Sequence, residues 1–208
     1  GFKETGIAGS DPPIKIVLSN ERSFGWARYH TGEIGLRGDV YSNVHWAVVA
    51  GEANTERRAG ALRVLVHELG HHLGPSINST RYRSDQAYLV LSQTINELWA
   101  QQNTEAVLRA TGIRYDTKLS NSLSAYRTGY QPWVERLRTI FKELGMNDFE
   151  VREFVNRLNL TEMTEDFSKI VWDEVWNRGP KLTARGDFGE VILKPKRFHW
   201  LIAAIRSS

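Results

Sequence analysis

The sequence contains no cysteine, and this absence limits the chemistry that is open to it. Without thiols the chain forms no disulfides and offers no thiolate ligands, so a bound metal ion would have to rely on His, Asp or Glu. No apolar run approaches the roughly 18 residues that a membrane-spanning helix needs, and the chain does not open with a signal-peptide pattern. We therefore expect a soluble chain without a membrane partner, in a compartment that these residues do not identify.

An excess of one charge is also missing. The 27 Lys and Arg residues nearly balance the 24 Asp and Glu residues, which leaves a formal net charge of +3. Nucleic-acid binding usually requires a continuous basic stripe, whereas short clusters such as residues 194–197 are isolated here. The charge pattern therefore gives no reason to expect a nucleic-acid partner.

What is present is the composition of a globular domain. Hydrophobic residues make up 41% and charged residues 25% of the 208 residues, close to the average for folded proteins. This length suits a single domain, 1–208, that buries a sizeable core. Because the chain begins at Gly1 and lacks an initiator Met, we expect a domain excised from a longer or secreted protein.

The first fifty residues predict a small sheet. Short segments that alternate or are β-branched occur at 14–18, 24–29, 33–36 and 46–50. The segments 24–29 and 33–36 flank a short polar turn and predict a β-hairpin. We expect these strands to form a mostly antiparallel sheet, and together with the helices that follow they predict an α+β fold.

Helical periodicity begins at about residue 54. It predicts one helix that ends at Leu73, before Gly74 and Pro75, and a second helix from residue 86 toward Gly112. Amphipathic patterns predict three more helices, at 132–144, 148–158 and 165–176. We therefore expect the sheet and two helices within 1–112, followed by a mainly helical subdomain in 113–208.

The first predicted helix carries an HExxH motif, His67-Glu68-Leu69-Gly70-His71. Two histidines four residues apart lie on one helix face, so their imidazoles can bind one ion at roughly 2.0–2.1 Å. Glu68 is displaced around the helix but can reach a water held by the metal, which is the place of a general base. The motif arises by chance about 0.01 times in a chain of this composition. We predict His67 and His71 as metal ligands and Glu68 as general base.

Residues 66–74 resemble the active-site helix of the zincin metallopeptidases. The resemblance implies Zn²⁺ as cofactor, peptide-bond hydrolysis by a metal-activated water, and a third ligand further along the chain. Gly74 fits the metzincin pattern, but Ile77 stands where that pattern has its third His. This departure argues against the metzincins.

In the gluzincins a Glu from a following helix completes the metal site. Asn96-Glu97 resembles the corresponding segment of thermolysin-like enzymes, and Glu97 to Ala100 resembles the Glu-aromatic-Ala segments of lethal-factor-like and phage-repressor-cleaving peptidases. The turn around Glu97 is otherwise apolar, and a carboxylate on such a face needs a partner. We predict Glu97 as the third ligand. Gln101 occupies the place where thermolysin-like enzymes carry an Asp that supports a ligand imidazole.

The resemblance also implies a hydrogen-bond donor for the carbonyl oxygen of the substrate. We choose Tyr130 as this second catalytic residue because it precedes a predicted helix that can fold back over the site, with Tyr126, Tyr115 and His199 as alternatives. Zincins usually pair an extended protein or peptide substrate with an edge strand beside the active-site helix. Residues 26–36 are expected to supply that strand.

These predictions together describe a zinc-dependent metallopeptidase, most simply an endopeptidase. Two alternatives stay open: a dedicated effector or toxin domain that cuts one protein partner, and a catalytically degenerate zincin fold that only binds. Glu68 argues against the second, because a structural zinc site needs no base beside its ligands. Ligand type favours zinc but leaves other first-row metals open. Substrate specificity and oligomeric state are not encoded in any motif of this chain.

Overall fold

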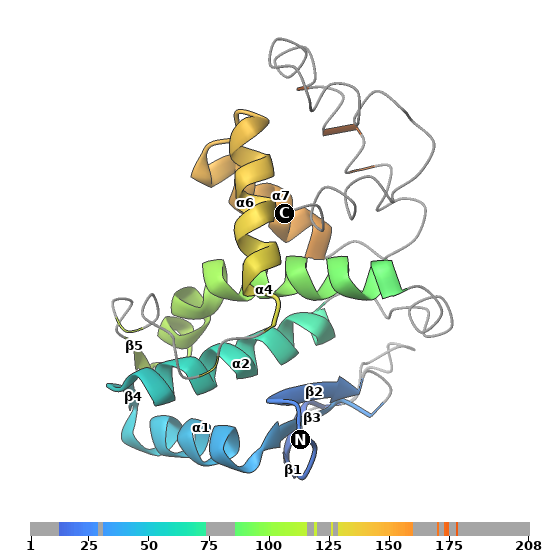
Figure 1. Cartoon of the computed structure of the whole chain (residues 1–208). Coiled ribbons are helices and arrows are strands. Elements are labelled where there is room, and N and C mark those ends of the chain that lie inside the picture. The colour runs from blue at the N-terminus through green and yellow to red at the C-terminus, as the bar shows by residue number, and fades with distance from the viewer. Residues whose placement is uncertain are drawn as a thin grey trace, which may run out of the picture.

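The protein is arranged in layers around one central helix, α2 (Glu56–Leu73) (Figure 1). The structure is a computed structural model that describes residues 13–28, 31–73, 86–115 and 129–159, together with Leu119, Tyr126, Ile170, Asp173, Glu174 and Arg178. A small sheet and one helix lie on one side of α2. A long helix and two shorter ones lie on its other side, so the predicted α+β fold is confirmed.

The main sheet has three strands, β1 (Lys15–Ser19), β2 (Gly25–Arg28) and β3 (Glu33–Arg37), in the order β1-β3-β2. The predicted hairpin is confirmed, since β2 and β3 pair antiparallel. The prediction of a mostly antiparallel sheet is wrong, because β1 pairs with β3 in parallel. The chain leaves β1 for the far edge of the sheet and only then returns through the hairpin to its centre, which aligns β1 with β3.

Helix α1 (Gly38–Ala50) replaces the strand that was predicted at 46–50. Val40, Val44 and Ala47 recur at helical spacing and are buried, whereas Val48 and Val49 are exposed. The β-branched residues Val48 and Val49 favour a strand locally, but the segment is helical because a helix buries the apolar face formed by Val40, Val44 and Ala47. Two short strands, β4 (Glu52–Ala53) and β5 (Arg114–Tyr115), form a separate parallel pair.

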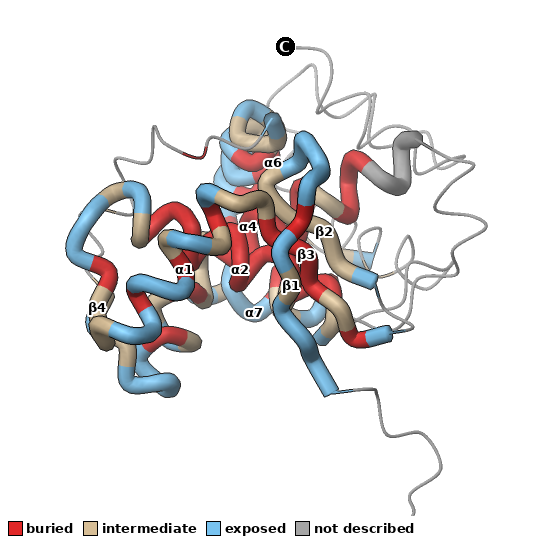
Figure 2. The backbone as a smooth tube through the Cα atoms, turned by 90° about the horizontal axis from the view of Figure 1, so that it is seen from below, coloured by how far each residue is buried: buried red, intermediate tan, exposed pale blue. Residues whose placement is uncertain are grey.

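Helices α2 and α4 (Gln86–Ala110) confirm the two helices predicted around the motif. They pack closely at Gly70, where a Cβ atom would lie 2.2 Å from Asn96 Oδ1 and 2.8 Å from the Trp99 ring. Only glycine allows this approach. Most residues of α2 are buried, as are most of residues 90–110 of α4, whereas β1 at the edge of the sheet is largely exposed (Figure 2).

Two further helices, α6 (Gln131–Glu143) and α7 (Asp148–Asn159), confirm the predictions at 132–144 and 148–158. Both pack on α4, and their apolar faces share one buried cluster with α4 and with Val66 of α2. A second buried cluster lies between α2, α1 and the sheet. The helix predicted at 165–176 lies outside the described residues, apart from Ile170, Asp173 and Glu174.

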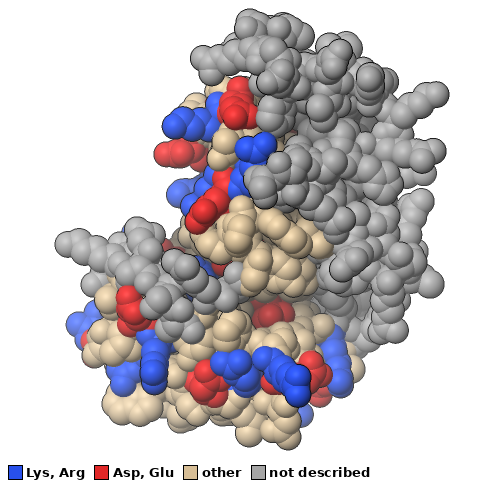
Figure 3. Space-filling view, viewed as in Figure 1, with Lys and Arg blue, Asp and Glu red and all other residues tan. Residues whose placement is uncertain are grey.

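The described surface carries both signs of charge. Basic and acidic side chains alternate across the face in Figure 3, and no broad field of one sign forms among the residues coloured there. In the described part of the chain, no helix is long and apolar enough to cross a membrane.

Candidate metal centre

Helix α2 carries three buried polar residues on its last turns, His67, Glu68 and His71, which are 5%, 7% and 8% exposed. The sheet side and the α4 side of α2 are both covered by other elements, so the motif lies inside the protein. Buried titratable groups need polar partners. Residues of α4 contact the two histidines, whereas Glu68 lies on the side of α2 that faces β2.

The two histidines meet at a residue that the motif does not contain. Gln93 Oε1 lies 3.0 Å from Nε2 of His67 and 3.3 Å from Nε2 of His71. The two imidazole rings are nearly perpendicular, with centroids 5.0 Å apart. Both Nε2 atoms therefore face the same small volume beside α4.

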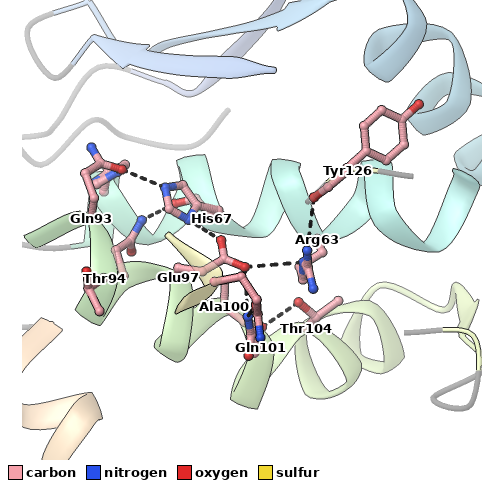
Figure 4. Close-up of polar contacts among 12 residues, drawn as sticks. Arg63, His67, Gln93, Thr94, Glu97, Ala100, Gln101, Thr104 and Tyr126 are labelled. Carbon is pink, nitrogen blue, oxygen red and sulfur yellow. Dashed lines mark hydrogen bonds and ion pairs between the residues drawn. The ribbon is translucent and has the colours of Figure 1, made fainter. Parts of the chain in front are cut away.

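Glu97 approaches His67 from the other side of its ring (Figure 4). Its Oε2 lies 2.9 Å from Nδ1 of His67, whereas its Oε1 accepts a hydrogen bond of 3.0 Å from Gln101 and lies 3.5 Å from Arg63 Nε. The Glu97 side chain is only 1% exposed. Both carboxylate oxygens therefore have partners: Oε2 contacts the imidazole of His67, and Oε1 contacts Gln101 and the buried guanidinium of Arg63.

The charges of this cluster follow from the contacts. Burial alone raises the pKa of Glu97, but His67 and Arg63 outweigh it and hold the pKa below its usual value. Burial alone lowers the pKa of His67, but the hydrogen bond to Glu97 and the charge of Glu68 raise it above its usual value. The pKa of His71 is lowered to about 3, first by burial and then by the neighbouring charge of His67.

Glu68 lies between α2 and the edge strand β2. A Cβ atom on Gly25, the first residue of β2, would lie 2.9 Å from both Cγ and Oε1 of Glu68. Burial raises the pKa of Glu68, and the negative charge of Glu97 adds to the rise while His67 opposes it. This environment makes the carboxylate a stronger base than an exposed glutamate.

Tyr130 lies against His67. Its ring is parallel to that of His67, with 8° between the planes and 6.4 Å between the centroids. Tyr130 is the residue before α6, and burial followed by the charges of Glu68 and Glu97 raises its pKa. A neutral phenol at this position can donate a hydrogen bond into the site.

The alternatives to Tyr130 lie elsewhere or outside the described residues. Tyr126 packs edge-on against Phe24 in the cluster beside the sheet, and its hydroxyl accepts a hydrogen bond of 3.4 Å from Asn43. Tyr115 belongs to β5 and packs against the same cluster. His199 falls outside the described residues. Of the three candidates that the structure describes, Tyr130 is the one whose ring stacks on His67.

The polar groups fit a metal ion only when Gln93 is included. Within the residues that the structure describes, no three His, Cys, Asp or Glu side chains are grouped to hold an ion by themselves. The Glu97 carboxylate, predicted as the third ligand, faces Nδ1 of His67, whereas the two Nε2 atoms face Gln93. The two buried imidazoles supply two nitrogen donors of the kind that zinc accepts, and the oxygen between them belongs to the Gln93 amide.

Gln93 and Arg63 belong to this polar cluster, although the sequence motif does not predict them. Gln93 precedes Glu97 by one helical turn, and Arg63 precedes His67 by one turn. Arg63 interrupts an otherwise apolar stretch of a buried helix, which is a signal that the sequence offers. Gln93 stands between a serine and a threonine, so its only signal is its position one turn before Glu97. Arg63 also donates a hydrogen bond of 3.2 Å to the carbonyl of Tyr126.

Comparison with known proteins adds no relative: no protein-family model, no curated protein and no solved structure matches this chain.

Proposed function

We propose that this chain is a zinc-dependent metallopeptidase that hydrolyses internal peptide bonds. The observation that carries the proposal is the buried convergence of the His67 and His71 Nε2 atoms on one point, with the basic carboxylate of Glu68 on the same helix. A structural cross-link would not need a buried base at that position, whereas hydrolysis does. Glu97, which the sequence predicts as the third ligand, completes the polar site from α4.

His67 and His71 would hold the ion through Nε2, with α4 supplying the remaining protein donor. When bound, zinc would polarise the scissile carbonyl and lower the pKa of a water molecule in the site. The low pKa of His71 suits this role, because its imidazole stays neutral near neutral pH, whereas His67, whose pKa is raised, would have to release a proton to bind the ion.

Glu68 is proposed as the proton carrier of the reaction. Its raised pKa lets the carboxylate accept the proton of the attacking water at Oε1 or Oε2. As the C–N bond breaks, the same carboxyl group returns that proton to the departing amine. The carboxylate is thereby restored, and one water is consumed for each peptide bond cleaved.

Tyr130 is proposed to stabilise the oxyanion. Its hydroxyl is kept protonated by burial and by two nearby carboxylates, and its ring lies along His67. A hydrogen bond from this phenol would strengthen as negative charge develops on the carbonyl oxygen. Strand β2 supports the predicted mode of substrate binding, because within the described residues it pairs only with β3 and lies against α2.

The test is metal content by mass spectrometry, with cleavage of an unfolded protein substrate measured in parallel. We expect about one zinc per wild-type chain, and less than about a tenth of that in His71→Ala. Glu68→Gln should keep its zinc and lose about 100-fold or more in cleavage rate, because the base is gone while the ligands remain. Tyr130→Phe should also keep its zinc and lose about 10-fold or more in rate.

The outcomes separate the alternatives. A wild-type chain that binds no zinc after exposure to the metal would contradict the proposal. Zinc binding without cleavage of any substrate would favour the degenerate binding module. Cleavage confined to one native protein, with unfolded substrates left intact, would favour the dedicated effector protease.

A further inference from the structure

Gln93 stands at the position that a third metal ligand would occupy. In a tetrahedral site with ligands at about 2.0–2.1 Å, neighbouring donor atoms are about 3.3–3.4 Å apart. Gln93 Oε1 lies 3.0 Å and 3.3 Å from the two Nε2 atoms, close to that spacing. An ion could therefore enter among these three atoms with only small shifts of the side chains.

Glu97 is held in a different role. Its Oε2 faces Nδ1 of His67, the ring nitrogen that points away from Gln93 (Figure 4). Its Oε1 accepts from Gln101 and faces Arg63. For Glu97 to bind an ion at the two Nε2 atoms, the carboxylate would have to leave these three partners. Arg63, a buried cation 7% exposed, would then lose its closest carboxylate.

Gln93 and Glu97 contact different nitrogens of His67 because of their spacing on α4. Gln93 and Glu97 are four residues apart on α4, so they project from the same face one turn apart. One reaches Nε2 of His67 and the other reaches Nδ1 of the same ring. A carboxylate on the far nitrogen of a ligand imidazole fixes its tautomer and makes it a better donor.

We propose that Gln93 is the third protein ligand of the metal, through Oε1, and that Glu97 is a positioning residue that orients His67. The inference rests on the proposed function and changes the predicted ligand set from two His and a Glu to two His and a Gln. An amide oxygen is a neutral donor, so such a site would hold zinc less tightly than one with a bound carboxylate. The negative charge of Glu97 then balances the ion from behind His67.

The test is the zinc dissociation constant of the whole chain, measured by competition with a chromogenic chelator. We expect Gln93→Ala to weaken binding by about 100-fold or more, and Gln93→Glu to bind more tightly than the wild type because a carboxylate replaces the amide. Glu97→Gln should still bind one zinc, about 10- to 100-fold more weakly, as expected for the loss of an orienting carboxylate. Gln102→Ala is the matched control on the same helix and should leave the constant unchanged.

A second readout does not depend on affinity. Cobalt substituted for zinc should show a changed visible absorption spectrum in Gln93→Glu, because a ligand atom has changed, and an unchanged band pattern in Gln102→Ala. If Gln93→Ala fails to fold, Gln93→Asn, whose amide is one methylene short of the histidines, should show the same loss of affinity.

The inference is overturned if Gln93→Ala binds zinc as tightly as the wild type or more tightly while Glu97→Gln loses it. Glu97 would then be the third ligand, and Gln93 would only be a hydrogen-bonding neighbour of the two histidines. That result leaves the proposed peptidase intact. A wild-type chain that binds no zinc overturns the proposed function itself, so the two failures are distinguishable.

Discussion

His67 and His71 are the same side chain one helical turn apart, yet their surroundings move their pKa values in opposite directions. His67 has a carboxylate on Nδ1 and another carboxylate beside it, which favour its charged form. His71 is equally buried, but its neighbouring charge is that of His67 and disfavours a second cation. The difference comes from α4, which brings Glu97 to one ring only.

This difference predicts a pH dependence for the metal-free chain. The pKa of His71 is about 3 when folded, against 6.5 for an ordinary histidine. Below pH 6.5 the unfolded chain takes up a proton that the folded chain does not. Stability is therefore complete above pH 6.5 and falls by about 1 kcal/mol per pH unit as the pH drops toward the folded value.

The measurement is urea unfolding between pH 7 and pH 4.5 in the presence of a chelator. The wild type should lose stability more steeply with falling pH than His71→Leu, in which this titration is absent. Groups that do not interact with His71 titrate alike in both proteins and cancel in the comparison. Parallel stability curves would contradict the buried, neutral state assigned to His71.

At the scale of elements, the close crossing of α2 and α4 positions the polar residues of the candidate site. Gly70 permits the crossing because it has no side chain, and Asn96 of α4 donates a hydrogen bond of 2.6 Å to the carbonyl of His67. This crossing is what brings Gln93 and Glu97 to the histidines. A small change at Gly70 should therefore disturb both the packing and the site.

We expect Gly70→Ala to destabilise the protein by about 1–3 kcal/mol, because its Cβ would overlap Asn96 and Trp99 and the helices would have to separate. Gly38→Ala, at the start of α1, is the control, since its nearest neighbour would be an ordinary 3.7 Å contact with Leu18. Urea midpoints compare the two. Equal stabilities would show that the crossing tolerates a side chain.

The elements also show how far local patterns reach. The helices at the motif and beyond it, and the β2–β3 hairpin, follow from periodicity and turn signals. The strand predicted at 46–50 is wrong: these residues are the end of α1, and Val40, Val44 and Ala47 carry the helical signal. The parallel pairing of β1 has no local signal at all, since it depends on which edge of the sheet the chain visits first.

At the scale of the whole molecule, two buried clusters share α2. One joins α2 to α4, α6 and α7, and the other joins it to α1 and the sheet. Phe154 of α7 is 4% exposed and packs edge-on against Phe141 of α6, with centroids 5.6 Å apart. Because the first cluster continues to Val66 beside the motif, loss of packing in α7 should also disturb the proposed metal site.

We expect Phe154→Ala to lower the free energy of unfolding by about 3–5 kcal/mol, because it leaves a cavity in this cluster. Phe149→Ala on the same helix, where the side chain is 72% exposed, should change stability by no more than about 0.5 kcal/mol. Unfolding followed by far-UV circular dichroism and by zinc release should coincide. Zinc retained after the helices have melted would contradict a shared core.

The sequence by itself determined the features that depend on neighbours along the chain. The i, i+4 spacing places His67 and His71 on one helix face, and the place of Glu68 directly after His67 sets it to one side of that face. Apolar periodicity predicts most of the helices. These follow because helical geometry fixes the relative directions of residues a few positions apart.

Only the tertiary structure decided what depends on how the elements pack. That Gln93 faces Nε2 and Glu97 faces Nδ1 of one imidazole follows from the crossing of α2 and α4 at Gly70. That Tyr130 lies along His67 follows from the docking of α6 on α4. Such contacts join residues tens of positions apart, so no local spacing specifies them, and the buried surfaces of the whole molecule select them together.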